Sequence, residues 1–139
     1  MRQYIRHPSD IPIVYDFMEF ISDQKEYLKD ISVGGLCFRS RIAIPQGTCL
    51  ALQIPLTHPV FRAKGIVTWC RPQQSCYEIG VQFLDEHTEF RARMVEQVCY
   101  IEHYKRDIFE KEGRVLSGED AAVEWIQKYA SRFPGSRLT

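Results

Sequence analysis

The chain has 139 residues, a length that suits one ordinary domain or one domain with an appendage. Its 18 basic and 18 acidic side chains cancel, so no global field attracts the protein to nucleic acid or anionic lipid, and we expect neither as a partner. No apolar stretch approaches the ~20 residues that a membrane-spanning helix needs, and no signal-like segment follows Met1. We therefore expect no membrane insertion and a cytoplasmic location.

The cysteine pattern supports the same compartment. The five cysteines form an odd number without a CxxC pair, and each lies within or beside an apolar stretch. This pattern predicts reduced, mostly buried thiols in a reducing compartment. The residues are Cys37, Cys49, Cys70, Cys76 and Cys99.

Two arginines lie four residues apart near the start of the chain, Arg2 and Arg6, in an RxxxR pattern. A guanidinium is a planar fork that can bond a phosphate, or the O6/N7 edge of guanine, through two hydrogen bonds. Two exposed arginines near an end are also common in a solvated tail. The pattern alone therefore leaves both interpretations open.

The first half of the chain contains six prolines by position 72, and no further proline occurs until Pro134. Such frequent breaks are typical of short strands joined by turns. Apolar side chains alternate with period two over residues 61–69 and 77–83. Together with four similar segments, they predict a small six-stranded antiparallel barrel. The expected strands are Ile11–Phe20, Glu26–Val33, Leu36–Ser40, Thr48–Ile54, Phe61–Trp69 and Tyr77–Phe83.

A second polar pattern, DxSxxG, spans residues 30–35. An ionised Asp30 only accepts hydrogen bonds, so it can take both the N1–H and N2–H₂ donors of guanine. Strand alternation places Asp30 and Ser32 on one face. Gly34 and Gly35 suit a strand end where φ is positive or where the backbone is closely approached, as by a flat base.

The alternative for this pattern is an Asx-type turn that closes a hairpin, because Asp and Ser bond nearby backbone and Gly supplies the turn. The order of the two patterns, separated by one β-like segment, favours a ligand. Arginine forks followed by a carboxylate, a hydroxyl and two glycines suit a molecule with phosphates and guanine edges. We therefore expect a guanine nucleotide.

The segments RQYIRHPSDIPI, KDISVGGLCFRS and IVTWCRPQQSCYEIGVQF are together similar to the PilZ domain, the bacterial receptor module for cyclic di-GMP. The similarity covers roughly residues 1–86 and keeps the order of the motifs and the closing Gly-Val-x-Phe strand. It implies a PilZ-like barrel, mainly β, followed by two helices. It also implies cyclic di-GMP as the ligand.

By this resemblance, Arg2 and Arg6 lie on a loop that folds over the ligand and grips phosphate and guanine. Asp30, Ser32 and Gly35 hold a guanine at the barrel surface. Ordering of the arginine loop would change a surface that an effector protein recognises, a disorder-to-order switch.

Two features qualify the resemblance. Many relatives carry a further basic residue immediately before the first motif arginine, where this chain has Met1. In the family that residue accompanies a stacked pair of nucleotides, so its absence favours one bound molecule. Trp69 sits where some relatives present a tryptophan to the nucleotide, but it also falls on the mainly apolar face of its strand. Core packing and ligand stacking are both open.

Beyond residue 86 the apolar period becomes helical, so we divide the chain into a barrel, residues 1–86, and a helical extension, residues 87–139. A first helix is expected from Thr88 to Glu112, ending at Gly113. Its apolar stripe consists of Phe90, Met94, Val98, Ile101 and Ile108.

A second helix should begin near Ser117, where Ser-Gly-Glu-Asp resembles a capping box, and end before Pro134. Its apolar face must be covered by the barrel, by the first helix, by a second copy in a homodimer or by an effector protein. The face consists of Ala122, Trp125, Ile126, Tyr129 and Phe133.

Catalytic and metal-site patterns are missing from the sequence. The four histidines have no HxxH or HExxH spacing, and there is no P-loop or nucleophile elbow. The acid pairs 85–86 and 119–120 lie at expected helix starts, where the helix dipole favours negative charge. We expect a binding module rather than an enzyme. The alternative to a receptor is a constitutive interaction protein that acts through its helices without useful nucleotide affinity.

Overall fold

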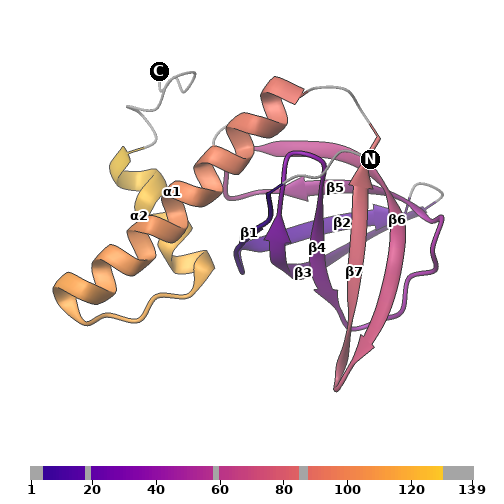
Figure 1. Cartoon of the computed structure of the whole chain (residues 1–139), viewed down its shortest axis with the longest axis horizontal. Helices are drawn as coiled ribbons and strands as arrows, with labels where there is room; N and C mark the ends of the chain where they lie inside the picture. Colours follow the sequence, from indigo (N-terminus) through magenta and orange to yellow (C-terminus); the bar gives the residue numbers. More distant parts are fainter. Residues whose placement is uncertain (1–4, 18–19, 58–59, 85–87, 130–139) are drawn as a thin grey trace.

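The computed structural model describes residues 5–17, 20–57, 60–84 and 88–129, and Figure 1 shows their arrangement. These residues form seven strands and two helices in chain order. The strands are β1 (His7–Pro8), β2 (Pro12–Phe17), β3 (Phe20–Ile31), β4 (Gly35–Ser40), β5 (Cys49–Ile54), β6 (Phe61–Gln73) and β7 (Cys76–Phe83), and the helices are α1 (Thr88–Glu112) and α2 (Gly118–Tyr129).

Six strands close into an antiparallel barrel, as predicted. The order runs β3–β2–β5–β6–β7–β4, and a further pairing of β4 with β3 closes the ring. The short β1 was not predicted. It pairs with the end of β3, with His7 opposite Ile31 and Pro8 opposite Asp30. This pairing brings the end of the RxxxR motif beside the start of the DxSxxG motif.

Several predicted strand bounds differ from the observed ones. β2 ends at Phe17 and β3 begins at Phe20, whereas the prediction ran the first strand to Phe20 and began the second at Glu26. β6 runs to Gln73 rather than ending at Trp69, because a bulge after Val67 interrupts the alternation on which the prediction relied. β3 ends at Ile31, and Ser32 belongs to the turn that follows.

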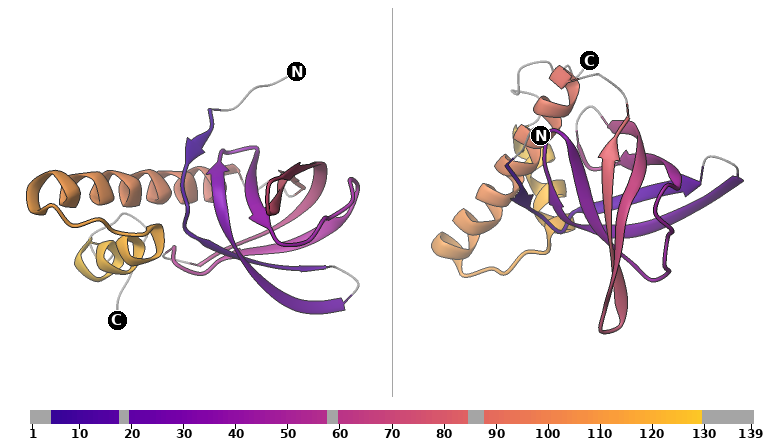
Figure 2. Two further views of the ribbon diagram at one scale, coloured as in Figure 1. Left: turned by 90° about the horizontal axis from the view of Figure 1, so that it is seen from below. Right: turned by 45° about the vertical axis from the view of Figure 1, so that its right-hand side comes forward.

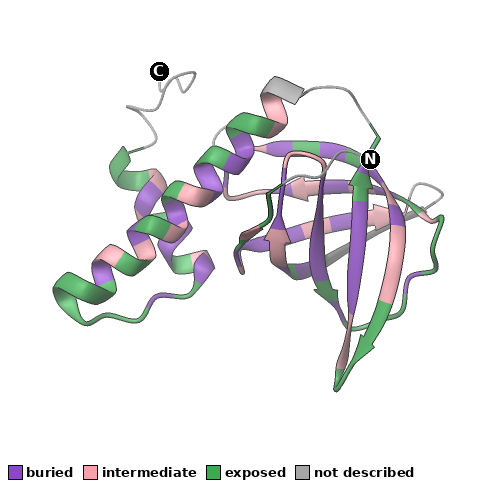
Figure 3. Cartoon of the chain, in the orientation of Figure 1, coloured by how far each residue is buried: buried purple, intermediate pink, exposed green. Residues whose placement is uncertain are grey.

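The barrel interior is filled by the inward side chains of all six strands, seen as the buried positions in Figure 3. Tyr15, Phe38 and Phe61 are the largest side chains that are fully buried. Phe90 of α1 stacks on Phe61 with ring centroids 5.2 Å apart. The first turns of α1 therefore pack on the barrel, although the proposed division at residues 86 and 87 stays a prediction.

The helix pair lies to one side of the barrel (Figure 2). The bounds of α1 agree with the prediction, and Gly113, with φ of 69°, terminates the helix in the left-handed conformation that glycine tolerates. The Ser117 hydroxyl accepts a hydrogen bond from the Asp120 amide at 3.0 Å, which confirms the predicted cap. α2 ends at Tyr129, so the predicted Phe133 lies outside the described residues.

The apolar face of α2 is covered by α1. Trp125 is 5% exposed and its ring lies parallel to that of Tyr100, with centroids 6.1 Å apart. The Tyr104 hydroxyl donates to Glu124 at 2.8 Å and adds a polar contact between the helices. Tyr129 is exposed at the end of this face. Within residues 88–129, internal packing thus accounts for Trp125 without a partner protein.

The helix pair is joined to the barrel at Asp10, just after β1. Lys105 of α1 approaches the Asp10 carboxylate at 3.2 Å. Gly118, the first residue of α2, lies so close to Asp10 that an added Cβ would overlap the carboxylate. Neither described helix combines the length and apolar character that crossing a bilayer requires.

All five cysteines are free, as predicted. The prediction of mostly buried thiols holds fully for Cys37, partly for three others, and not for Cys49. Cys49 begins β5 and is exposed to solvent.

Candidate ligand-binding site

Four residues from four strands form one row across the outside of the barrel. Asp30 of β3 pairs with Cys37 of β4, Cys37 with Gly80 of β7, and Gly80 with Trp69 of β6. Directly opposed residues in an antiparallel ladder share a face. The neighbours of Gly80 along its strand point into the core, so this row points outward, and we call it the outer row.

The bulge in β6 decides the orientation of Trp69. Val67 is buried in the core, the register shifts before Trp69, and Cys70 again packs against the core. A bulge adds one residue to a strand and reverses the alternation beyond it. The assignment of Trp69 to the apolar face, made from strict alternation, was therefore wrong.

Gly80 makes room for the tryptophan ring. A Cβ at this position would overlap the indole, so the ring lies directly over the glycine on the outer surface of the sheet. The guanidinium of Arg71 lies over the same ring, 4.6 Å from its centroid. Sequence reasoning missed both residues; the signal for Arg71 was its spacing of two from Trp69, once the bulge is known.

At the other end of the outer row, Arg6 reaches the carboxylate of Asp30. Arg6 Nη1 lies 3.3 Å from Asp30 Oδ1, and the two side chains are 47% and 23% exposed. The pairing of Pro8 with Asp30 places the arginine there. An ion pair this open to water contributes little to stability, so another ligand of either group can replace it. Arg2 lies outside the described residues.

Ser32 belongs to the turn between β3 and β4. It is 1% exposed, and its hydroxyl donates to the Gly35 carbonyl at 3.1 Å and accepts from the Gly35 amide at 3.2 Å. The Ser32 hydroxyl thus holds the turn, which is the alternative that the DxSxxG pattern had left open. The turn fixes the end of β3 and thereby the position of Asp30.

The two glycines of the motif lie against β7. The Gly34 carbonyl accepts a hydrogen bond from the Phe83 amide at 3.0 Å, and a Cβ on Gly35 would overlap the Val81 carbonyl oxygen. The expected close backbone approach is therefore found at Gly35, with β7 as the neighbour. Among the described glycines, positive φ is recorded for Gly47 and Gly113.

Charged groups surround the outer row. The two carboxylate oxygens of Glu78 lie 3.2 and 3.1 Å from Lys29 Nζ. Between Asp30 and Gly80, Cys37 is 2% exposed, and its burial, reinforced by the carboxylates of Asp30 and Glu78, raises the pKa of its thiol to about 11. The floor of the row is thus neutral at physiological pH, with cations at both ends.

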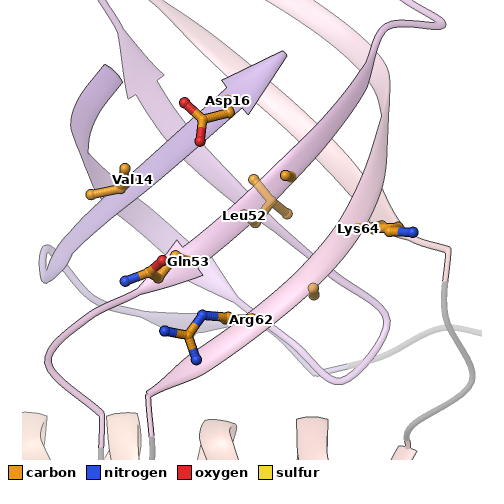
Figure 4. A pocket seen from close by; sticks show the side chains of 8 residues that line it. Val14, Asp16, Leu52, Gln53, Arg62 and Lys64 are labelled. Carbon is orange, nitrogen blue, oxygen red and sulfur yellow. The ribbon is translucent and has the colours of Figure 1, made fainter. Parts of the chain in front are cut away.

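A surface cavity of about 470 Å³ lies elsewhere, over β2, β5 and β6 (Figure 4). Its polar lining includes Asp16, Gln53, Arg62 and Lys64 and none of the motif residues. The cavity and the outer row are therefore separate features. No cluster of three potential metal ligands occurs in the portion of the chain that the structure describes.

Comparison with known proteins identifies the family of the chain. The family model described as "PilZ domain" matches residues 1–99. Among solved structures, the PilZ domain of YcgR from Escherichia coli with c-di-GMP is 16% identical, with a TM-score of 0.61, and the match covers 82% of this chain and 98% of that one. No curated protein matches at a significant level.

Two further structures share the fold. The K. pneumonia MrkH–c-di-GMP complex is 17% identical with a TM-score of 0.59, over 77% of this chain and 55% of that one. The Bacillus subtilis inhibitor of motility, MotI/DgrA, is 17% identical with a TM-score of 0.57, over 80% and 52%. The chain spans about half the length of these two structures. On the strength of the family match and the closed barrel, the chain belongs to the PilZ domain family.

Proposed function

We propose that this protein is a bacterial cyclic di-GMP receptor that binds the nucleotide on the outer row and acts as an adaptor rather than as an enzyme. The observation that carries the proposal is the register of β3, β4, β7 and β6, which aligns Asp30 and Trp69 on one outward face with Arg6 at its end. The family, and neighbours that hold c-di-GMP, support the same ligand.

The chemistry assigns a role to each group. Asp30 accepts hydrogen bonds from the N1–H and N2–H₂ donors of a guanine. Arg6 and Arg2 pair with phosphate or with the O6/N7 edge. Trp69 offers a flat face on which a base can stack. Ser32, Gly34 and Gly35 shape the turn that presents Asp30, and we propose that the backbone of this turn borders the bound base.

Binding requires an exchange of partners. In the free protein Arg6 occupies Asp30, so a guanine that bonds Asp30 releases Arg6 to the ligand. Arg6 is close to β1, which leads directly to Asp10 and the helix pair. We propose that the ordered arginine segment forms part of the surface that an effector protein recognises, with one nucleotide bound per chain.

Calorimetric titration with cyclic di-GMP, with GTP as a control ligand, tests the assignment. Arg6→Ala should weaken binding by about tenfold or more, because a hydrogen bond to a charged group is worth roughly 1.5–3 kcal/mol. Arg62→Ala, an exposed arginine in the separate cavity, is the matched control and should bind normally. An unchanged dissociation constant for Arg6→Ala would remove the arginine motif from the site.

Amide hydrogen exchange tests the switch. The amides of residues 5–7 should exchange more slowly with cyclic di-GMP than without it, because the released Arg6 gains ligand contacts that hold this segment. GTP at the same concentration should leave their exchange rate unchanged. Equal protection of these amides with and without cyclic di-GMP would indicate a preformed site that does not switch.

A further inference from the structure

Arg71 lies on the ligand face of the barrel, yet no motif assigns it a role. Residues two apart in a strand share a face, and Cys70 between them packs against the core, so Trp69 and Arg71 both project outward. The guanidinium lies over the indole, 4.6 Å from the ring centroid. In the free protein, Arg71 therefore covers a ring face that a stacked base would need.

The contacts of Arg71 are weak enough to exchange. Its partner across the ladder is Glu78, but both carboxylate oxygens of Glu78 lie within hydrogen-bonding distance of Lys29 Nζ, at 3.2 and 3.1 Å. Arg71 is exposed, and a cation–π contact at an exposed site is weak. A phosphate oxygen accepts stronger, charge-assisted hydrogen bonds from a guanidinium.

The outer row has an arginine at each end, and a cyclic dinucleotide has two phosphates that can pair with them. Arg6 lies at the Asp30 end and Arg71 at the Trp69 end, three strand spacings apart, or about 14 Å. A cyclic dinucleotide carries two phosphates and two bases. A ligand that bonds Asp30 with one guanine and extends along the row brings its remaining anionic group toward Arg71.

We propose that Arg71 is a further ligand-binding residue of this site: it leaves the Trp69 ring to a guanine and pairs with a phosphate of the same molecule. This inference rests on the proposed function and adds a third arginine, which lies on β6 and outside the RxxxR motif. In the free protein, each of these two arginines contacts a group that the nucleotide would bind: Arg6 pairs with Asp30, and Arg71 lies over Trp69.

The test is titration with cyclic di-GMP at low and high salt. Arg71→Gln should weaken binding by about tenfold or more and reduce its salt dependence, because a phosphate contact is lost. Arg71→Lys should recover part of the affinity, since an ammonium keeps the charge but not the fork. Arg62→Gln, the same charge change at an exposed position of β6 outside the outer row, should bind like the unmodified chain.

Each outcome has a distinct meaning. If the unmodified chain binds and Arg71→Gln binds equally well or more tightly, Arg71 only covers the ring and the inference is wrong. If Arg71→Gln and Arg62→Gln weaken binding equally, the effect is one of overall charge and the inference is again wrong. If the unmodified chain does not bind cyclic di-GMP, the proposed function fails and the role of Arg71 fails with it.

Discussion

The two tryptophans of this chain lie in regions that use aromatic rings in opposite ways. On the barrel, Trp69 is half-buried beneath an exposed guanidinium, over a glycine that leaves it room. In the helix pair, Trp125 is 5% exposed and stacked on Tyr100. The first ring is held by contacts that a ligand can replace. The second is held by contacts whose loss leaves a cavity.

This difference teaches that an aromatic residue on a regular pattern does not reveal its role until its neighbours are known. Both residues fit an apolar periodicity in the sequence. Only the bulge in β6 separates Trp69 from the core, and only the docking of α2 on α1 covers Trp125. The following substitutions should therefore act on stability in one region and on binding in the other.

The largest effect is expected in the helix pair. Trp125→Ala should lower the free energy of unfolding by about 3–5 kcal/mol, because removal of a buried ring leaves a cavity against Tyr100. Urea denaturation measures this loss, and Val123→Ala, on the exposed side of the same helix, is the control. Cyclic di-GMP affinity should change little while the barrel stays folded. A stable Trp125→Ala protein that lost nucleotide binding would contradict the division between the two regions.

A smaller effect concerns the floor of the outer row. The pKa of Cys37 rises to about 11 in the folded protein, chiefly because the thiol is buried, so the folded state holds this proton more tightly than the unfolded chain. The resulting stability is complete below the ordinary thiol pKa and is lost as pH rises through the folded value, by up to about 2–3 kcal/mol.

Urea denaturation of the unmodified chain and of Cys37→Ala, from neutral pH to about pH 11, checks this linkage. The loss of stability at alkaline pH should be smaller in Cys37→Ala, whereas Cys49→Ala, at an exposed thiol, should follow the unmodified chain. Burial also raises the pKa of Cys99 and of Tyr15, and these groups contribute to the pH dependence of all three proteins. The difference between the stability–pH profiles of the unmodified chain and Cys37→Ala therefore isolates the contribution of Cys37. Parallel profiles for all three proteins would show that the thiol is not shielded.

The smallest effect is expected at Ser32. Ser32→Ala should lower stability by about 1 kcal/mol, because the Gly35 amide loses its buried acceptor in the turn. Thermal unfolding measures this change, with Thr48→Ala, whose exposed hydroxyl donates to Pro45, as the control. A large loss of cyclic di-GMP affinity with unchanged stability would instead give the hydroxyl a direct role in binding.

Local patterns were sufficient for much of the fold. Period-two alternation identified β6 and β7, and segments bounded by turn residues indicated the other four barrel strands. Helical spacing identified α1 to its end before Gly113, and Ser117 marked the start of α2. These signals depend on neighbours within a few residues. β1 was not predicted because a strand of two residues is too short to show alternation. Its pairing depends on Ile31 and Asp30, which lie far along the chain.

The two arginines and the aspartate of the candidate site were also evident from local sequence, together with the nucleotide chemistry they favour, whereas Trp69 was suggested by the family resemblance alone. The arrangement of these residues was not evident. The row from Asp30 to Trp69 depends on three ladder registers and on two register shifts, one before Asp30 in β3 and one before Trp69 in β6. The position of Arg71 follows from the shift in β6. Register and bulges arise from contacts between strands that are distant in the sequence, and the alternation along one strand carries no information about those contacts.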